Sequence, residues 1–393
     1  MTASLPEERE KVEEILRNLR LSRVEARRGE DNVQVARYVQ KTSIECVEVQ
    51  LNPLLNRIRS ELLEAIREYV NRLNSLGLGG DLGVPPRMKQ LIDLRAKPEY
   101  STNLSARSAL FSLIRLTIML GLVETQTLES FIQFVEKLQS KIKGVGLKDL
   151  LQNEHLKTAY GIAKGTLELG VEHPKLEELV KILKNLPTGE KAIVLTSYRA
   201  SVQEIYRRLA SEGLKARILV GKRSCEGLSQ KEQVAVLEDM RKGVFDILVA
   251  TQVGEEGLDI PECRLVVFYD NVPSAVRFVQ RRGRTGRRSP GRVVAFLVKG
   301  TRDEGYYWLA RRKLKEAKLL IEDFKLNKEV KNLDDYLKHR EGPTIYVDVR
   351  ESRSILTSLE KMGADLKVKQ LDIGDFVLSE DVVVERKTVE DYV

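Results

Sequence analysis

The stretch DILVATQVGEEGLDIPECRLVVFYD, residues 246–270, places two apolar runs on either side of a loop that contains glycine. The runs ILVA and LVVFY are continuous rather than alternating, which is typical of strands buried on both faces of a parallel sheet. The loop between them follows the carboxyl end of the first strand, the edge at which such sheets bind ligands. The stretch therefore predicts an α/β fold with a ligand site at that edge.

The same pattern extends over residues 172–325. Further apolar strands are expected at 192–197, 216–221 and 292–298, and helices at 199–211, 229–242 and 274–282. Because strands and helices alternate, the segment predicts one parallel sheet covered by helices on both faces.

The segment before it, residues 54–171, is expected to be all-helical. Apolar side chains recur there at steps of three and four residues, beginning with Leu55, Ile58 and Leu62. Further helices are expected at about 103–121, 126–142 and 146–168. These apolar stripes indicate the core of a helical domain.

The two ends of the chain are smaller pieces. Residues 1–53 hold one charged helix and a short strand, 46–51, which cannot form a core and are expected to need a sheet from outside the chain. Residues 326–342 are polar and charged and read as a linker. Residues 343–393 are expected to begin a second, smaller α/β unit.

The composition excludes several classes of site. Lys and Arg number 66 against 58 Asp and Glu, a net charge of +8 that matters only where it is clustered. The three cysteines are scattered and the three histidines stand alone, which argues against a disulfide framework, a cysteine zinc site or a histidine metal centre. The longest apolar stretch, 111–123, contains Arg115 and is expected to be too short to span a membrane.

The basic residues are concentrated near RFVQRRGRTGRR, residues 277–288. Between residues 271 and 315 there are 13 Lys or Arg against two acidic residues. Arginines favour bidentate binding of phosphate, and the interleaved Gly283 and Gly286 let the backbone approach a ligand closely. The segment therefore predicts phosphate recognition, beside a loop in which Thr251, Gly257 and Asp259 offer groups for a nucleotide.

GEEGLDIP (254–261) and QRRGRTGR (280–287), with IVLTSYR upstream, resemble motifs of the second RecA-like motor domain of superfamily-two helicases. GLSQKEQ (227–233) and KGTRDEGYYW (299–308) resemble the Hef and FANCM family in particular. In that family a thumb-like helical domain separates two motor domains, which fits residues 54–171. MTAS (1–4) resembles the motif that closes the first motor domain, so residues 1–53 are expected to be its end.

The resemblance implies roles for individual residues. Arg284 and Arg287 would be the arginine fingers that reach the γ-phosphate of ATP. Gln280, with Gly257 and Asp259, would hold the nucleotide. The DNA backbone contacts would come from Thr196, Arg199, Thr251 and Arg281.

The sequence lacks the cradle of an ATP site. It contains no G-K-S or G-K-T, and no D-E-x-H or D-E-x-D that could hold magnesium. The first motor domain is therefore expected to be encoded separately or missing, and the chain by itself is expected to hydrolyse ATP negligibly.

The carboxyl-terminal segment carries carboxylates in a second pattern. IYVDVRE (345–351), LDIGDF (371–376) and VVVERKTVED (382–391) bring acidic residues to a short strand and a hairpin. Carboxylates gathered at one place need a cation, and Mg²⁺ or Mn²⁺ suits oxygen ligands. The predicted metal ligands are Asp348, Asp375 and Glu385.

This pattern resembles the nuclease motif of the XPF family of structure-specific endonucleases. The resemblance adds Arg386, Lys387 and Asp391 to the catalytic residues. The domain is expected to be truncated at Val393, to cut DNA weakly or not at all in this form, and to pair through exposed apolar strands with a second copy.

Three functions follow as alternatives. The chain is part of an ATP-driven motor and nuclease that acts on branched DNA in repair or fork restart, a metal-dependent endonuclease with a DNA-binding arm, or a non-catalytic DNA-binding fragment. In each case we expect an intracellular, cytoplasmic protein associated with the nucleoid and not with a membrane.

Overall fold

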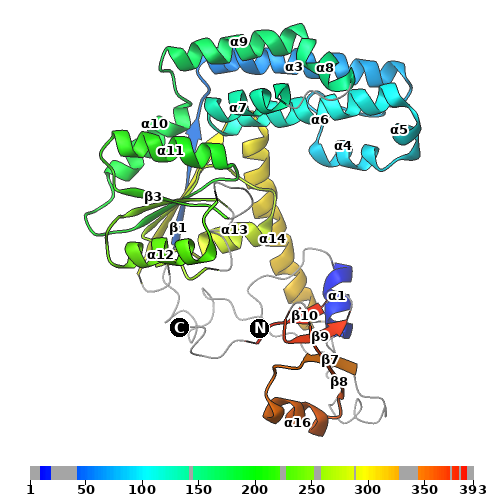
Figure 1. The fold of residues 1–393 in the computed structure, drawn as a ribbon, viewed down its shortest axis with the longest axis vertical. Coiled ribbons are helices and arrows are strands. Elements are labelled where there is room, and N and C mark those ends of the chain that lie inside the picture. Colours follow the sequence, from blue (N-terminus) through cyan, green and yellow to red (C-terminus); the bar gives the residue numbers. More distant parts are fainter. Residues whose placement is uncertain are drawn as a thin grey trace. The chain divides into compact units, whose positions relative to one another are not determined.

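The computed structural model describes residues 9–18, 42–140, 145–221, 227–251, 258–286, 289–326, 344–371, 374–379 and 382–386. The chain divides into two units: one is Arg28–Arg312, and the other combines Met1–Arg27 with Lys313–Val393. Helix α14 (Arg302–Leu326) begins in the first unit and ends in the second. Each unit contains its own β-sheet (Figure 1).

The first unit contains a six-stranded parallel sheet in the order β1-β6-β5-β2-β4-β3. Its central strands are buried along their whole length, as their continuous apolar sequences predict. The strands are β1 (Thr42–Val49), β2 (Ala192–Leu195), β3 (Ala216–Leu219), β4 (Ile247–Ala250), β5 (Leu265–Phe268) and β6 (Gly291–Val298). The predicted α/β fold with a parallel sheet is confirmed.

Strand β1 corrects one expectation. It lies at the edge of this sheet and pairs in parallel with β6, from Thr42 opposite Gly291 to Val49 opposite Val298. The prediction that this strand needs a sheet from outside the chain is wrong. The sequence near β1 does not reveal the partner strand, because the two strands are far apart along the chain. Glu45 and Arg292, which form a 2.7 Å ion pair between them, are 247 positions apart.

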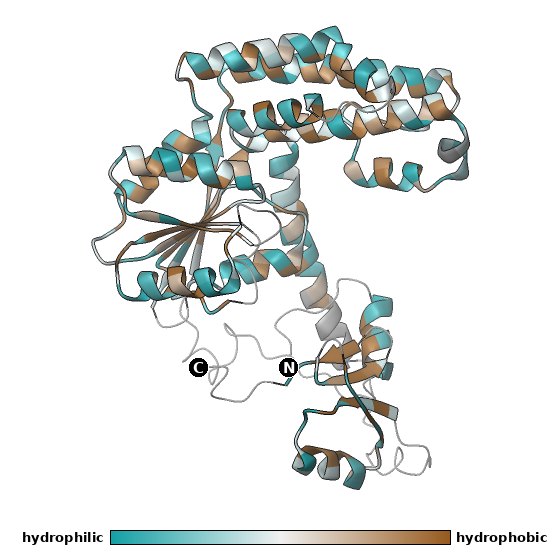
Figure 2. Ribbon diagram, in the orientation of Figure 1, coloured by the Kyte–Doolittle hydropathy of each residue, from teal (hydrophilic) through white to brown (hydrophobic). Residues whose placement is uncertain are grey.

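Helices cover both faces of the sheet, and together they form what we call the sheet domain. Figure 1 shows α10 (Pro174–Lys184) and α11 (Arg199–Ser211) over one face, and α12 (Gln230–Arg241) and α13 (Ala275–Arg282) over the other. Their apolar faces turn inward and their polar faces outward (Figure 2). The three helices predicted within 199–282 are therefore confirmed to within one residue at each end.

Seven helices of residues 53–168 form the helical domain of the same unit. The long α6 (Leu104–Thr125) lies at its centre and is apolar on most of its circumference. The predicted single helix at 146–168 is two helices, because the Asn153 side chain accepts a hydrogen bond from Leu156 N–H and starts a new one. The others are α3 (Pro53–Ser75), α4 (Met88–Arg95), α5 (Pro98–Thr102), α7 (Leu128–Gln139), α8 (Val145–Gln152) and α9 (Glu154–Glu168).

Helix α6 also corrects the expectation about membrane-spanning length. It has 22 residues, and by length and composition alone it could cross a membrane. However, 67% of its most apolar window is buried inside the protein, where it packs among the other helices of the domain. Its apolar composition is thus accounted for by its place in the core.

The second unit contains α1 (Arg9–Asn18) and a four-stranded mixed sheet in the order β10-β9-β7-β8. Strands β7 and β8 are parallel, and the hairpin of β9 and β10 is antiparallel. Its core is small and centres on Ile345, Val347 and Phe376. The elements are β7 (Thr344–Asp348), α16 (Arg353–Lys361), β8 (Asp365–Lys369), β9 (Phe376–Ser379) and β10 (Val382–Val384). The predicted linker falls almost wholly outside the described residues.

Candidate functional site

The arginine-rich helix α13 lies beside the carboxyl ends of β5 and β2. Arg281 on this helix is only 1% exposed, and its guanidinium donates a 2.6 Å hydrogen bond to the Asp270 carbonyl. A second guanidinium nitrogen lies 3.6 Å from the Asp270 carboxylate. In this structure Arg281 therefore holds α13 to the sheet, and it presents no surface to DNA.

The predicted arginine finger Arg284 turns toward the predicted nucleotide loop. It is 8% exposed, and its guanidinium donates a 2.9 Å hydrogen bond to the Leu258 carbonyl. The neighbouring Asp259 is exposed and forms a 2.6 Å ion pair with Arg241. The structure thus brings Arg284 to the loop that carries Asp259, while Gln280 is half-buried on α13. Gly257 and Arg287 lie outside the described residues.

Two of the predicted DNA contacts are buried. Thr196 has no exposed surface, and its hydroxyl donates a 2.9 Å hydrogen bond to the side chain of Gln126 in the helical domain. Thr251 is 8% exposed at the end of β4. Because both side chains are buried, neither offers its hydroxyl to a phosphate in this arrangement. Arg199, by contrast, lines a cavity.

This cavity, which we call the interdomain groove, lies between the helical domain and the sheet domain and has a volume of about 710 Å³. The helical domain contributes Lys137, and the sheet domain contributes Arg199 and Arg207. Tyr198 and Phe134 add aromatic rings, and the remaining lining residues are Leu122, Ser130, Gln133, Ala200, Gln203 and Val220. Basic side chains combined with aromatic rings are the composition expected of a nucleic-acid site.

Two basic side chains of the groove, Lys137 and Arg207, are exposed. Arg207 is paired with Glu129 at 2.8 and 3.1 Å, but its side chain is 59% exposed. Exposed pairs of this kind contribute about 0–1 kcal/mol, so a phosphate can replace the carboxylate at little cost. Sequence reasoning missed Lys137 and Arg207, because they lie on different domains and only the fold brings them together.

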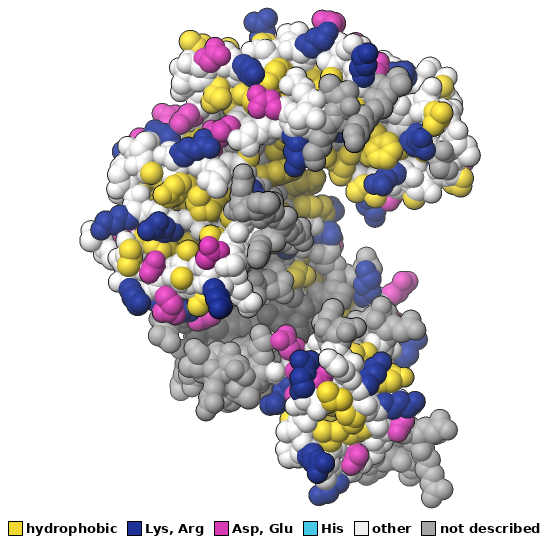
Figure 3. Space-filling model, viewed as in Figure 1, with side chains coloured by type: hydrophobic (Ala, Val, Ile, Leu, Met, Phe, Trp, Pro, Cys, Tyr) yellow, Lys and Arg dark blue, Asp and Glu magenta, His cyan; other side chains and the backbone are white. Residues whose placement is uncertain are grey.

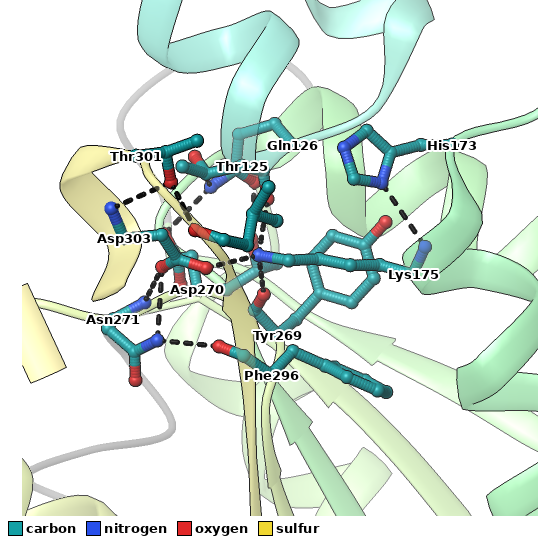
Figure 4. A network of polar contacts seen from close by, with 12 residues as sticks. Thr125, Gln126, His173, Lys175, Tyr269, Asp270, Asn271, Phe296, Thr301 and Asp303 are labelled. Atoms are coloured by element: carbon teal, nitrogen blue, oxygen red, sulfur yellow. Dashed lines mark hydrogen bonds and ion pairs between the residues drawn. The ribbon is translucent and has the colours of Figure 1, made fainter. Parts of the chain in front are cut away.

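A buried network of polar side chains joins the helical domain and the sheet domain (Figure 4). The Lys175 ammonium donates to the Thr125 carbonyl at 3.1 Å, the Tyr269 carbonyl at 2.8 Å and the Asp303 carboxylate at 2.7 Å. Both ends of the ion pair are completely buried. The other Asp303 oxygen accepts two hydrogen bonds from Asn271, so this charge is fully compensated.

His173 lies two positions before Lys175 in the sequence and caps the start of helix α10. It is 1% exposed, and burial, with the nearby Lys175 ammonium, lowers the pKa of His173 to about 3. Its Nδ1 accepts a 3.2 Å hydrogen bond from the Lys175 backbone N–H. His173 is thus the N-cap residue of α10.

Glu204 on α11 is a buried carboxyl group at the same junction. Burial first, and then the nearby Glu129 and Glu172 carboxylates, raise the pKa of Glu204 from its usual 4.5 to about 7. An acid with a raised pKa destabilises the fold when it is ionised. This cost is absent below pH 4.5, grows between pH 4.5 and about 7, and stays constant above pH 7.

We therefore expect Glu204→Gln to stabilise the protein by on the order of 2 kcal/mol at pH 8 and to have little effect at pH 4.5. Denaturant unfolding at both pH values measures this. Glu177→Gln, which changes an exposed glutamate on α10, is the control and should show no such pH dependence. Equal stability changes at both pH values would contradict the assignment.

In the second unit, the hairpin brings two predicted metal ligands together. The Asp375 backbone N–H donates to the Val384 carbonyl at 2.9 Å, and the Asp375 carboxylate accepts from the Arg386 N–H at 2.6 Å. These two bonds flank Glu385, so Asp375, just before β9, and Glu385, just after β10, lie opposite each other. The Arg386 side chain pairs with Glu351 at 3.1 Å.

Gly374 makes this arrangement possible. Its φ is +74°, and an added Cβ would lie 2.1 Å from the Val383 side chain and 3.1 Å from the Val384 carbonyl. Only glycine avoids both the strained dihedral angle and the contact with the opposite strand. The G-D dipeptide is therefore needed to place the Asp375 carboxylate at the end of the hairpin.

Asp348, the third predicted metal ligand, is bonded to groups of its own unit in this structure, and its metal role stays a prediction. It is 1% exposed, and both of its oxygens are occupied by the Arg350 guanidinium and by the backbone N–H groups of Arg350 and Leu371. These bonds, the Arg350 side chain foremost, hold the pKa of Asp348 well below its usual range. This carboxylate fixes the turn after β7.

The remaining donors fit a hard divalent cation. Among the described residues no group of three or more His, Cys, Asp or Glu is arranged to hold a metal ion. Asp375 and Glu385 offer two neighbouring carboxylates, the ligand type that Mg²⁺ and Mn²⁺ prefer. Lys387 and Asp391 lie outside the described residues.

Comparison with known proteins agrees with both parts of this description. The family called helicase conserved C-terminal domain matches residues 174–289, and the ERCC4 domain family matches residues 347–393. The crystal structure of the Pyrococcus furiosus Hef helicase domain superposes with a TM-score of 0.61 at 34% identity, over 78% of this chain and 65% of that one. This chain is a Hef- and FANCM-like protein. The resemblance found in its motifs is confirmed.

Full-length relatives are longer than this chain. Protein MJ1505 of Methanocaldococcus jannaschii is 30% identical over all of this chain and 59% of its own length. The FANCM helicase of Arabidopsis thaliana is 30% identical over 78% of this chain and 24% of its own. The chain thus spans about three-fifths or less of these relatives, and it combines domains of a helicase and a nuclease family.

Proposed function

We propose that this chain is part of an ATP-dependent helicase or translocase joined to a structure-specific endonuclease, and that it acts on branched DNA in repair or fork restart. The interdomain groove is the observation that supports DNA binding best. It lies at the carboxyl edge of β2 and β3, next to the loops that bind ligands in parallel sheets. Several relatives of this chain carry the name ATP-dependent DNA helicase.

In this proposal the arginine side of an ATP site belongs to α13 and the loop at Leu258 and Asp259. Arg284 and Arg287 stabilise the charge of the departing γ-phosphate, and Gly257, Asp259 and Gln280 hold the nucleotide. A first RecA-like domain, present as a separate partner or elsewhere in the protein, supplies the P-loop. The nuclease activity uses Asp375, Glu385 and Lys387 with Mg²⁺ or Mn²⁺, which when bound would polarise the scissile phosphate.

The groove accounts for DNA binding by local charge rather than by overall charge. Figure 3 shows basic and acidic side chains interspersed on the visible face of the protein. A net charge of +8 spread in this way attracts DNA weakly, so affinity depends on where basic side chains meet. Lys137, Arg199 and Arg207 meet in the groove from two domains.

We expect the double variant Lys137→Gln/Arg207→Gln to bind forked DNA about thirtyfold more weakly than the wild type, because each of the two lost phosphate contacts costs on the order of 1 kcal/mol. Fluorescence anisotropy with a labelled fork at fixed salt measures this. The matched control is Lys157→Gln/Lys181→Gln, which removes one exposed lysine from each domain outside the groove. Equal losses in both variants would reject the groove as the DNA site.

A further inference from the structure

Gln126 stands at the centre of the buried contacts between the two domains. It follows α6 in the helical domain and has no exposed surface. Its side-chain oxygen accepts hydrogen bonds from Thr196 at 2.9 Å and Ser201 at 2.8 Å, and its side-chain nitrogen donates to the Asp270 carboxylate at 2.9 Å. One amide of the helical domain is thereby bonded to three groups of the sheet domain.

Asp270 connects this amide to the arginine-rich helix. It follows β5, and its carboxylate also accepts a 3.1 Å hydrogen bond from the Ser197 N–H at the end of β2. Its carbonyl accepts the 2.6 Å hydrogen bond from Arg281 of α13. A shift of α13 relative to the sheet must therefore strain the bonds of Asp270, and with them the position of Gln126.

Ser201 connects the same amide to the groove. Its hydroxyl lies 3.0 Å from the hydroxyl of Ser130, which lines the interdomain groove. Ser130 is on α7 of the helical domain, whereas Ser201 is in the first turn of α11, next to the lining residues Arg199 and Ala200. The chain of hydrogen bonds thus runs from α13 to both walls of the groove.

We propose that Gln126 is a positioning residue that transmits the position of helix α13 to the walls of the interdomain groove, a role that rests on the groove being the DNA site. The amide suits this role because its polarity is fixed: nitrogen toward the carboxylate, oxygen toward the two hydroxyls. No water-exposed partner competes with these bonds, since Gln126, Thr196 and Ser201 are all fully buried. The helical domain and the sheet domain therefore move as one body while these hydrogen bonds of Gln126 are intact.

The test exchanges the donor and the acceptor of the hydrogen bond between Gln126 and Asp270. Gln126→Glu places two carboxylates against each other, whereas Gln126→Glu/Asp270→Asn restores a hydrogen bond with donor and acceptor exchanged and keeps the net charge of the wild type. We expect the single variant to bind forked DNA about tenfold more weakly and to exchange amide hydrogens faster at residues 195–202. We expect the double variant to recover both values to within about threefold.

Rescue by the exchanged pair distinguishes positioning from a loss of stability alone. Gln139→Glu adds the same charge on an exposed position of α7 and should change neither value. The proposal is overturned if the single variant behaves as the wild type, or if the double variant is no better than the single. Rescued exchange with unchanged DNA affinity in all variants would support the link and reject the groove as the DNA site.

A smaller substitution tests the proposal even if the Gln126 variants do not fold. Ser201→Ala removes only the hydrogen bonds of the Ser201 hydroxyl to Gln126 and Ser130. The hydrogen bond between Gln126 and Asp270 stays in place. We expect it to weaken fork binding about threefold. Wild-type affinity and wild-type exchange in this variant would overturn the proposal.

Discussion

Replacing Lys175 by methionine is expected to lower the free energy of unfolding of the first unit by about 3–5 kcal/mol. The Lys175 ammonium and the Asp303 carboxylate are both completely buried at 2.7 Å. Removing the lysine leaves a buried carboxylate without its cation, which costs more than the pair itself contributes. Urea unfolding followed by circular dichroism measures the change.

Lys181→Met, which removes an exposed lysine of the same helix, is the control and should change the free energy by less than about 0.5 kcal/mol. Lys175→Met/Asp303→Asn should recover part of the loss, because it removes the unpaired charge. A loss below about 1 kcal/mol for Lys175→Met would show that the buried contacts of Lys175 do not stabilise the first unit.

Replacing Asp375 by asparagine is expected to weaken Mn²⁺ binding by about a hundredfold and to eliminate metal-dependent cutting of forked DNA. The substitution removes one of two neighbouring carboxylates but keeps an oxygen that can accept the Arg386 N–H. The hairpin should therefore keep its geometry. The electron paramagnetic resonance signal of free Mn²⁺ measures binding even where cutting by this chain is weak.

The control for this prediction is Asp365→Asn, which alters an exposed aspartate on β8 of the same sheet. It should leave Mn²⁺ binding and cutting unchanged. Strong Mn²⁺ binding by the Asp375→Asn variant would place the metal elsewhere. Cutting that persists in this variant would remove Asp375 from the catalytic residues.

The fold could be predicted from the sequence wherever the physical signal was local. Continuous apolar runs such as DILVAT predicted buried parallel strands, and three- and four-residue spacing predicted α3. Two errors had non-local or side-chain causes. The partner of β1 is β6, which is far away in the sequence. The break at Asn153 depends on one capping side chain.

The candidate site was less predictable for a similar reason. Motif position alone put Thr196 and Arg281 among the DNA contacts, but the structure buries them in contacts within the protein. Neither Gln126 nor Lys137 carries any motif signal. Their proposed roles depend on the packing of the helical domain onto the carboxyl edge of the sheet.

The salt dependence of fork binding tests the central claim, that this Hef- and FANCM-like chain holds the DNA backbone in its interdomain groove. The measurement is the slope of log affinity against log salt between about 50 and 200 mM, for the wild type and for Lys137→Gln/Arg207→Gln. The account predicts a steep slope for the wild type and a slope smaller by about two for the variant, because two phosphate contacts are lost. Identical slopes for both proteins would contradict it.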